Sequence, residues 1–167
     1  MKDTILFGDC RETLSQIDEK VRMCVTSPPY YGLRNYGDES NQIGQEDTPE
    51  EYIQNLVNIF RSVRNCLTDD GTLWVNIGDS YYNYRPGKGQ SLVKQTVANS
   101  KQDLPDKCAR RGNKLEGLKE KDLIGIPWML AFALRADGWY LRQDIIWHKP
   151  NPMPESVRDR CTKSHEY

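Results

Sequence analysis

A serine, two prolines and a tyrosine at positions 27–30 form a group that could hold an amine for reaction. Each proline fixes its backbone φ and lacks an N–H, so the Pro28 carbonyl is held rigidly beside the Ser27 hydroxyl. These two oxygens could accept both hydrogens of an exocyclic amine on a nucleobase while the Tyr30 ring stacks on the base. The nitrogen lone pair would then turn out of conjugation. Alignment with an electrophilic methyl group would supply most of the rate, with Pro29 holding the turn and no metal required.

Asp9 lies after an apolar run at 4–7, just as Ser27 lies after residues 21–26. Residues 21–26 have strand composition, and a short helix over 11–17 fits between the two runs. This order predicts a parallel βαβ unit, in which ligands bind beyond the carboxyl ends of the strands. We therefore expect Asp9 and Ser27 to lie near each other. Asp9 is equally suited to cap the helix that follows it, so both roles stay open.

Later segments predict further elements of an α/β domain. A capping box, Thr48 with Glu51, and a proline at the first helical position open a helix whose buried stripe is Tyr52, Leu56, Ile59, Phe60, Val63 and Leu67. Asp69-Asp70-Gly71 is expected to end that helix, and 72–77 to form a strand. A helix over 126–136 and a long strand over 139–148 follow, the latter broken by Pro150, Pro152 and Pro154. Residues 164–167 look like the start of another element.

Composition favours one globular domain that acts in the cytoplasm. Apolar residues make up 37% of the 167 residues, and 23 basic residues nearly balance 24 acidic ones, so overall charge predicts no partner. The five cysteines are scattered and lack metal-ligand spacing, which indicates reduced thiols and no metal. No apolar run is long enough to cross a membrane, and no secretion signal is expected.

A polar insert at about 83–121 interrupts these elements. Basic residues outnumber acidic ones in it, and Lys107, Arg110, Arg111 and Lys114 could follow the phosphate backbone of DNA. A solvated loop would have the same composition. Trp147, His148, Lys149 and Asn151 leave a similar choice between bordering a base pocket and packing.

The motif and its surroundings resemble one enzyme family. The segment TSPPYYGLRNYG at 26–37 looks like the catalytic motif and following loop of DNA amino-methyltransferases that act on N4 of cytosine or N6 of adenine. Further similarities follow in family order: GDC at 8–10, DGTLW at 70–74 and DIIWHKPNPMPES at 144–156. The resemblance covers nearly the whole chain.

This resemblance implies a fold, a cofactor and a substrate. The fold would be Rossmann-like, a mainly parallel sheet flanked by helices, with S-adenosylmethionine as methyl donor. The acceptor would be a base flipped out of double-stranded DNA. Serine at the position of Ser27 is more often associated with cytosine N4 in this family, which leaves adenine N6 as the alternative. Asp9 and Cys10 would contact the cofactor.

One family motif is missing from the sequence. The Gly-rich cofactor segment, FxGxGT, is expected after the catalytic motif, and the glycines at 87 and 89 lack the strand and helix that would have to flank it. We therefore expect residues 1–167 to form a partial methyltransferase domain, truncated at its C-terminus. The chain could act with a complementing chain that carries the missing segment. It could instead be an inactive fragment or a DNA-binding module.

Overall fold

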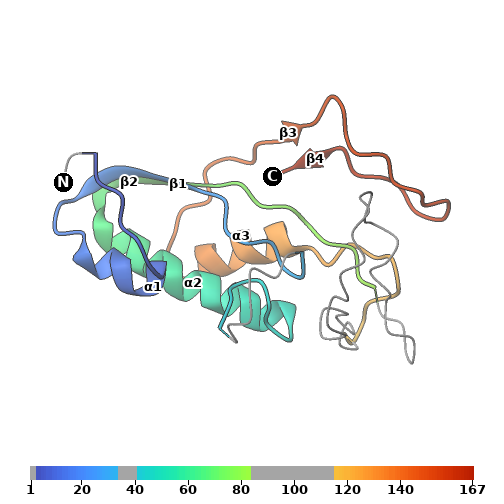
Figure 1. Ribbon diagram of the computed structural model, residues 1–167, viewed down its shortest axis with the longest axis horizontal. Helices are drawn as coiled ribbons and strands as arrows, with labels where there is room; N and C mark the ends of the chain where they lie inside the picture. The colour runs from blue at the N-terminus through green and yellow to red at the C-terminus, as the bar shows by residue number, and fades with distance from the viewer. Residues whose placement is uncertain (1–2, 34–40, 84–114) are drawn as a thin grey trace, which may run out of the picture.

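Two parallel strands with a helix between them form the centre of the computed structural model (Figure 1). β1 spans Val21–Thr26, α2 spans Pro49–Cys66 and β2 spans Leu67–Val75. The structure describes residues 3–33, 41–83 and 115–167, so most of the predicted insert and the loop 34–40 lie outside the described residues. A parallel βαβ unit is therefore present, as in an α/β fold.

The other elements are short. They are α1 (Cys10–Thr13), the 3-10 helix η1 (Leu14–Gln16), α3 (Ile126–Ala136), β3 (Trp147–His148) and β4 (His165–Glu166). β3 and β4 pair with each other in antiparallel orientation, as a second two-stranded sheet. In the described parts of the chain, no helix is long and apolar enough to cross a membrane.

The helix α2 forms for the predicted reasons. The Thr48 side chain accepts from the backbone of Glu51, the Glu51 side chain reaches back to the Thr48 N–H, and Pro49 opens the helix. The buried side of α2 packs into a core shared with α3. Its buried apolar members are Tyr52, Ile53, Leu56, Val57, Phe60 and Val63, whereas Ile59 is only half-buried.

The structure corrects the predicted strand at 4–7 and the predicted end of the helix before β2. Residues 4–7 form no strand, and the side chains of Ile5 and Phe7 are 75% and 88% exposed. An extended segment gains little without a neighbouring strand to pair with, and none pairs with it here among the described residues. The βαβ unit is consequently β1–α2–β2, one unit later than predicted. The helix α2 also ends at Cys66, so that 69–71 belong to β2.

The long strand expected over 139–148 is also largely wrong. Only Trp147 and His148 pair, and their partners are the two residues of β4. Residues 139–146 have no regular structure, and Tyr140, Ile145 and Ile146 remain exposed. Strand composition alone therefore did not produce a strand, because pairing depends on the neighbour that is available.

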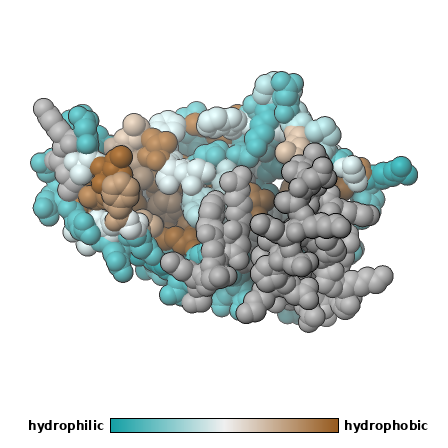
Figure 2. All heavy atoms as spheres, viewed as in Figure 1, coloured by the Kyte–Doolittle hydropathy of each residue, from teal (hydrophilic) through white to brown (hydrophobic). Residues whose placement is uncertain are grey.

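One face of the parallel pair carries exposed apolar side chains. Val25 lies opposite Trp74, Met23 is two residues earlier on β1, and these three side chains are 69%, 44% and 56% exposed. The opposite face, with Cys24 and Leu73, packs against the core. Figure 1 shows α1, α2 and α3 on one side of the strands, and Figure 2 shows hydrophobic residues at the surface where the N-terminal segment and β1 lie. Among the described residues, the helices thus cover one face of the sheet only.

Candidate active site

The predicted amine-binding motif lies where β1 ends. Ser27 directly follows the strand and is exposed, while Pro28 and Pro29 are half-buried. The carbonyl of Thr26 accepts a 2.9 Å hydrogen bond from the backbone N–H of Asn76, the residue after β2. The segments that leave β1 and β2 therefore run side by side at the carboxyl edge of the parallel pair. Ligands bind at this edge in open parallel sheets.

Contacts from the following loop and from α2 fix the backbone of the motif. The Tyr52 hydroxyl of α2 donates a 2.8 Å hydrogen bond to the Pro29 carbonyl. The Gly32 N–H donates to the Gly44 carbonyl at 2.9 Å. Gly44 has a φ of +87°, and a Cβ at this position would lie 2.9 Å from the carbonyl oxygen of Tyr30. Only glycine fits here without strain, so the turn after the prolines is closely packed.

The Tyr30 side chain is held at its hydroxyl and near its Cδ2 and Cε2 atoms. Its hydroxyl lies 2.9 Å from Oδ1 of Asn76 and 2.8 Å from Oε2 of Glu166, both of them hydrogen-bond acceptors. A Cβ on Gly78 would approach Cε2 of the ring to 2.7 Å, so the glycine allows the backbone after β2 to pack against the ring. Tyr30 is therefore ordered by residues from distant parts of the chain.

The surroundings of Tyr30 keep its hydroxyl protonated. Burial raises the pKa of Tyr30 above its ordinary value, and the hydrogen bond and charge of Glu166 act in the same direction. Hydrogen bonding from the Ser27 side chain acts in the opposite direction. At neutral pH the phenol is a hydrogen-bond donor.

Glu166 joins the C-terminal segment to this site. It forms an ion pair with Lys149, which directly follows β3. Burial favours a raised pKa for Glu166, but the hydrogen bonds from Lys149 and Tyr30 outweigh it, so the pKa lies below its usual value. The residue is an anion at neutral pH. The next residue, Tyr167, exchanges two backbone hydrogen bonds with Ile77, at 2.8 and 3.2 Å.

Comparison with known protein families identifies the family of this chain. The profile of a protein family described as DNA methylase, N6_N4_Mtase, matches residues 21–167. The chain belongs to this family. The membership in the N4-cytosine/N6-adenine methyltransferases that the motif predicted is therefore confirmed.

Curated relatives of this methylase chain are type II methyltransferases. It is 54% identical to M.SmaI of Serratia marcescens over 98% of its own length and 53% of the relative's. M.Cfr9I of Citrobacter freundii is 51% identical over 98% of this chain and 52% of the relative. M.XycI of Xanthomonas campestris pv. cyanopsidis is 50% identical, again over 98% and 52%. The chain spans about half the length of these relatives.

The two predicted cofactor contacts are placed less favourably than the motif. Asp9 caps α1 by accepting from the Arg11 N–H at 2.8 Å, and both of its carboxylate oxygens also accept from the Arg11 guanidinium. The side-chain hydrogen bond from Arg11 lowers the pKa of Asp9. Cys10 begins α1 and is exposed. The capping role of Asp9 is therefore observed, and a cofactor would have to compete with Arg11 for the Asp9 carboxylate.

A second acidic residue of the methylase chain organises the segment after β2. Asp79 Oδ1 accepts the N–H groups of Ser80, Gly125 and Ile126 at 2.9, 2.9 and 3.0 Å. Two of these donors belong to the N-terminus of α3. Ser80 in turn donates a 2.9 Å hydrogen bond to the Tyr31 carbonyl. Asp79 thus links α3 to the loop that follows the motif.

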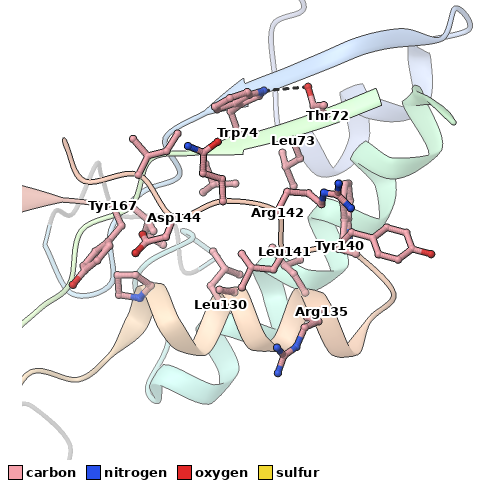
Figure 3. A pocket seen from close by; sticks show the side chains of 18 of the residues that line it. Thr72, Leu73, Trp74, Leu130, Arg135, Tyr140, Leu141, Arg142, Asp144 and Tyr167 are labelled. Carbon is pink, nitrogen blue, oxygen red and sulfur yellow. Dashed lines mark hydrogen bonds between the residues drawn. The ribbon is translucent and has the colours of Figure 1, made fainter. Parts of the chain in front are cut away.

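A cavity of about 640 Å³ lies beside the site rather than in it (Figure 3). It opens between β2, α3 and the irregular segment 139–145, and no residue of the motif lines it. Figure 3 shows Leu73 of β2 and Leu130 of α3 on its walls, with Tyr167 at one end. The lining of the cavity is mainly apolar. The cavity approaches the site through the residues that flank Asn76 and Glu166 in the sequence.

Sequence reasoning identified the motif but missed the residues that hold Tyr30. Asn76 and Gly78 lay in or next to a predicted strand without an assigned role, and Lys149 belonged to a motif of undecided role. Glu166 lay in a segment described only as the start of an element. The sole local signal was the position of Asn76 and Gly78 at a strand end. Nothing in the sequence connected Glu166 with Tyr30.

Proposed function

We propose that this chain carries the amine-binding site of a DNA methyltransferase that modifies N4 of cytosine. The observation that supports this most is the position of 27–30 at the carboxyl edge of β1, with Tyr30 held by Asn76 and Glu166. A rigid pair of oxygen acceptors beside a fixed aromatic ring suits a planar base with an exocyclic amine.

The residues of the chain bind and orient the base in this proposal. The Ser27 hydroxyl and the Pro28 carbonyl accept the two amine hydrogens, and Tyr30 stacks on the ring of the base. Loss of conjugation makes the nitrogen lone pair available, so positioning replaces a strong general base. S-adenosylmethionine, when bound, supplies an electrophilic methyl group. The chain offers Asp9 and Cys10 as candidate contacts, provided that Arg11 releases the Asp9 carboxylate.

The proposed substrate is double-stranded DNA with the target base flipped out. The relatives are named type II methyltransferases, which supports a role in restriction-modification. The cytoplasm is the proposed location because the scattered cysteines are typical of reduced thiols. The choice of cytosine rests on Ser27. N6 of adenine is the alternative, since its exocyclic amine offers the same two hydrogens.

Full activity in this proposal requires the Gly-rich cofactor segment, which residues 1–167 do not contain. The chain spans about half of its relatives, and Met23, Val25 and Trp74 form an exposed apolar face on the parallel pair. A sheet of a Rossmann-like domain buries both faces, so this face suits the segment that carries the Gly-rich cofactor motif. The alternative is an inactive fragment or a DNA-binding module, which would not need that segment.

Calorimetry and methyl transfer test the proposal together. The chain is titrated with S-adenosylmethionine, alone and mixed with the part of M.SmaI outside the matched region. Each sample is then assayed on duplexes whose only candidate targets are cytosines or adenines. We expect cofactor binding and transfer to cytosine in the mixture. Absence of transfer in both samples would contradict an enzyme, and DNA binding without transfer would favour the DNA-binding module.

A further inference from the structure

The hydroxyl of Tyr30 has two acceptors but only one proton. Asn76 Oδ1 and Glu166 Oε2 both lie within 3 Å of it, at 2.9 and 2.8 Å. A carboxylate is the stronger acceptor because its hydrogen bonds are charge-assisted. The amide is therefore a second contact that completes the cradle around the phenol oxygen.

Both acceptors are themselves fixed by the fold. The Asn76 backbone donates to the Thr26 carbonyl at 2.9 Å, and its Nδ2 donates to the Tyr167 carbonyl at 3.1 Å, which leaves Oδ1 directed at Tyr30. Glu166 belongs to β4, and the backbone pairing of Tyr167 with Ile77 holds β4 against the segment after β2. The cradle thus consists of two preorganised groups from segments far apart in sequence.

A chain of charged contacts extends from the cradle to β3. The charged or titratable groups that face Glu166 are Lys149, Tyr30 and Lys163. Lys149 forms the ion pair with Glu166, and Lys163 lies 4.5 Å from the ring centroid of Tyr167. The segment that begins with β3 is therefore connected to the phenol of Tyr30 through one carboxylate.

We propose that Glu166, assisted by Asn76 and held by Lys149, is a positioning residue that sets the Tyr30 ring for stacking on the target base. The role assigned to the ring rests on the proposed function, whereas the coupling of Glu166 to Tyr30 does not. Contacts at the phenol oxygen and between Gly78 and the Cδ2 and Cε2 atoms fix the ring. The ring then loses little freedom when a base stacks on it, and the amine reaches Ser27 and Pro28 in one orientation.

Nuclear magnetic resonance of the full chain tests this coupling. The nine tyrosines are labelled with ¹³C at Cζ, and the Tyr30 signal is the one lost in Tyr30→Phe. In the wild type, we expect this signal to follow the protonation of Glu166, with a midpoint below the usual carboxyl value of 4.5. Glu166→Gln abolishes that step. Lys149→Gln moves the midpoint to higher pH, because the carboxylate loses its cation.

Asp159→Asn is the matched control. It removes a C-terminal carboxylate that pairs with Lys121 and is not among the groups that shift the pKa of Tyr30 or Glu166, so it should leave the Tyr30 titration unchanged. Circular dichroism establishes that each variant is folded. A Tyr30 signal that shows no acid step in the folded wild type, or keeps the same step in folded Glu166→Gln, overturns the proposal. Lys149→Gln provides the same test if Glu166→Gln does not fold.

Turnover in the mixture with the remaining part of M.SmaI tests the consequence for catalysis. We expect Glu166→Gln to lower kcat by on the order of 10- to 100-fold with a smaller change in KM, as loss of alignment should. If the wild type transfers no methyl group but the acid step is present, the proposed function fails and the coupling stands. If the wild type is active and Glu166→Gln leaves kcat unchanged, the positioning role is refuted.

Discussion

The hydroxyl of Tyr52 donates a 2.8 Å hydrogen bond to the carbonyl of Pro29, which joins the middle of the buried helix face to the proposed base-binding motif. Tyr52 is fully buried, and its ring packs 5.5 Å from that of Tyr31. Burial strongly raises the pKa of Tyr52, so the phenol stays a donor at all ordinary pH values. The helix α2 therefore supports the motif directly as well as covering the sheet.

Removal of this hydroxyl should destabilise the protein. Tyr52→Phe keeps the ring but leaves the half-buried Pro29 carbonyl without its donor, at a cost of about 1–3 kcal/mol in the free energy of unfolding. Urea denaturation measures the difference. Tyr140→Phe, at a side chain that is 86% exposed, is the control and should be nearly neutral. Equal stabilities of Tyr52→Phe and the wild type would show that this hydrogen bond contributes nothing.

A methyl group on Gly78 should displace the Tyr30 ring. A Cβ at this position would lie 2.7 Å from Cε2 of Tyr30, well inside van der Waals contact. We expect Gly78→Ala to cost about 1–3 kcal/mol, the range for overpacking. In the Tyr30→Ala background the same change should cost much less, and this double-mutant cycle isolates the contact. Additive effects would mean that the two residues do not touch.

The carboxylate of Asp79 should be needed for docking of α3. Asp79→Ala removes the acceptor of the N–H groups of Gly125 and Ile126, and we expect a loss of about 1–3 kcal/mol. Asp79→Asn keeps one side-chain oxygen and should recover much of this loss. Thermal melts of the two variants make the comparison. If the two melt together below the wild type, the negative charge matters rather than the hydrogen bonds.

An ion pair between α2 and the end of α3 should make stability depend on acid. Arg61 donates to Asp137 at 2.6 Å, and this hydrogen bond lowers the pKa of Asp137 below 3.8. A carboxyl with a lowered pKa stabilises the fold above its unfolded value, and the contribution disappears as pH falls through the folded value. Asp137→Asn should thus be less stable than the wild type at neutral pH, with the difference shrinking below pH 3.8. A constant difference across this range would contradict the assignment.

Local sequence features predicted the parts of the fold that depend on neighbours along the chain. The capping box of Thr48 with Glu51 and the apolar spacing from Tyr52 to Val63 define α2 because a helix uses contacts three and four residues apart. The two prolines end β1 where expected, since they remove backbone donors. The motif at 27–30 could also be recognised from the sequence, because its four residues are consecutive.

Pairing and docking over long sequence separations could not be predicted in this way. Tyr30 and Glu166 are separated by 136 residues, and their contact depends on β4 lying against Ile77. The segments 4–7 and 139–146 have strand composition but no pairing strand among the described residues. A strand requires a neighbour, which composition does not supply. Residues 84–114 of the insert predicted at about 83–121 lie outside the described residues, and their role stays a prediction.

Mass spectrometry of the nucleosides from methylated duplex DNA tests most directly whether Ser27 serves cytosine. Wild-type chain and Ser27→Ala are each combined with the remaining part of M.SmaI and S-adenosylmethionine, after circular dichroism has established equal folding. We predict N4-methylcytosine from the wild type and a loss of about 100-fold or more in Ser27→Ala. N6-methyladenine from the wild type, or an unchanged rate in folded Ser27→Ala, would contradict the assignment of this site to cytosine methylation through Ser27.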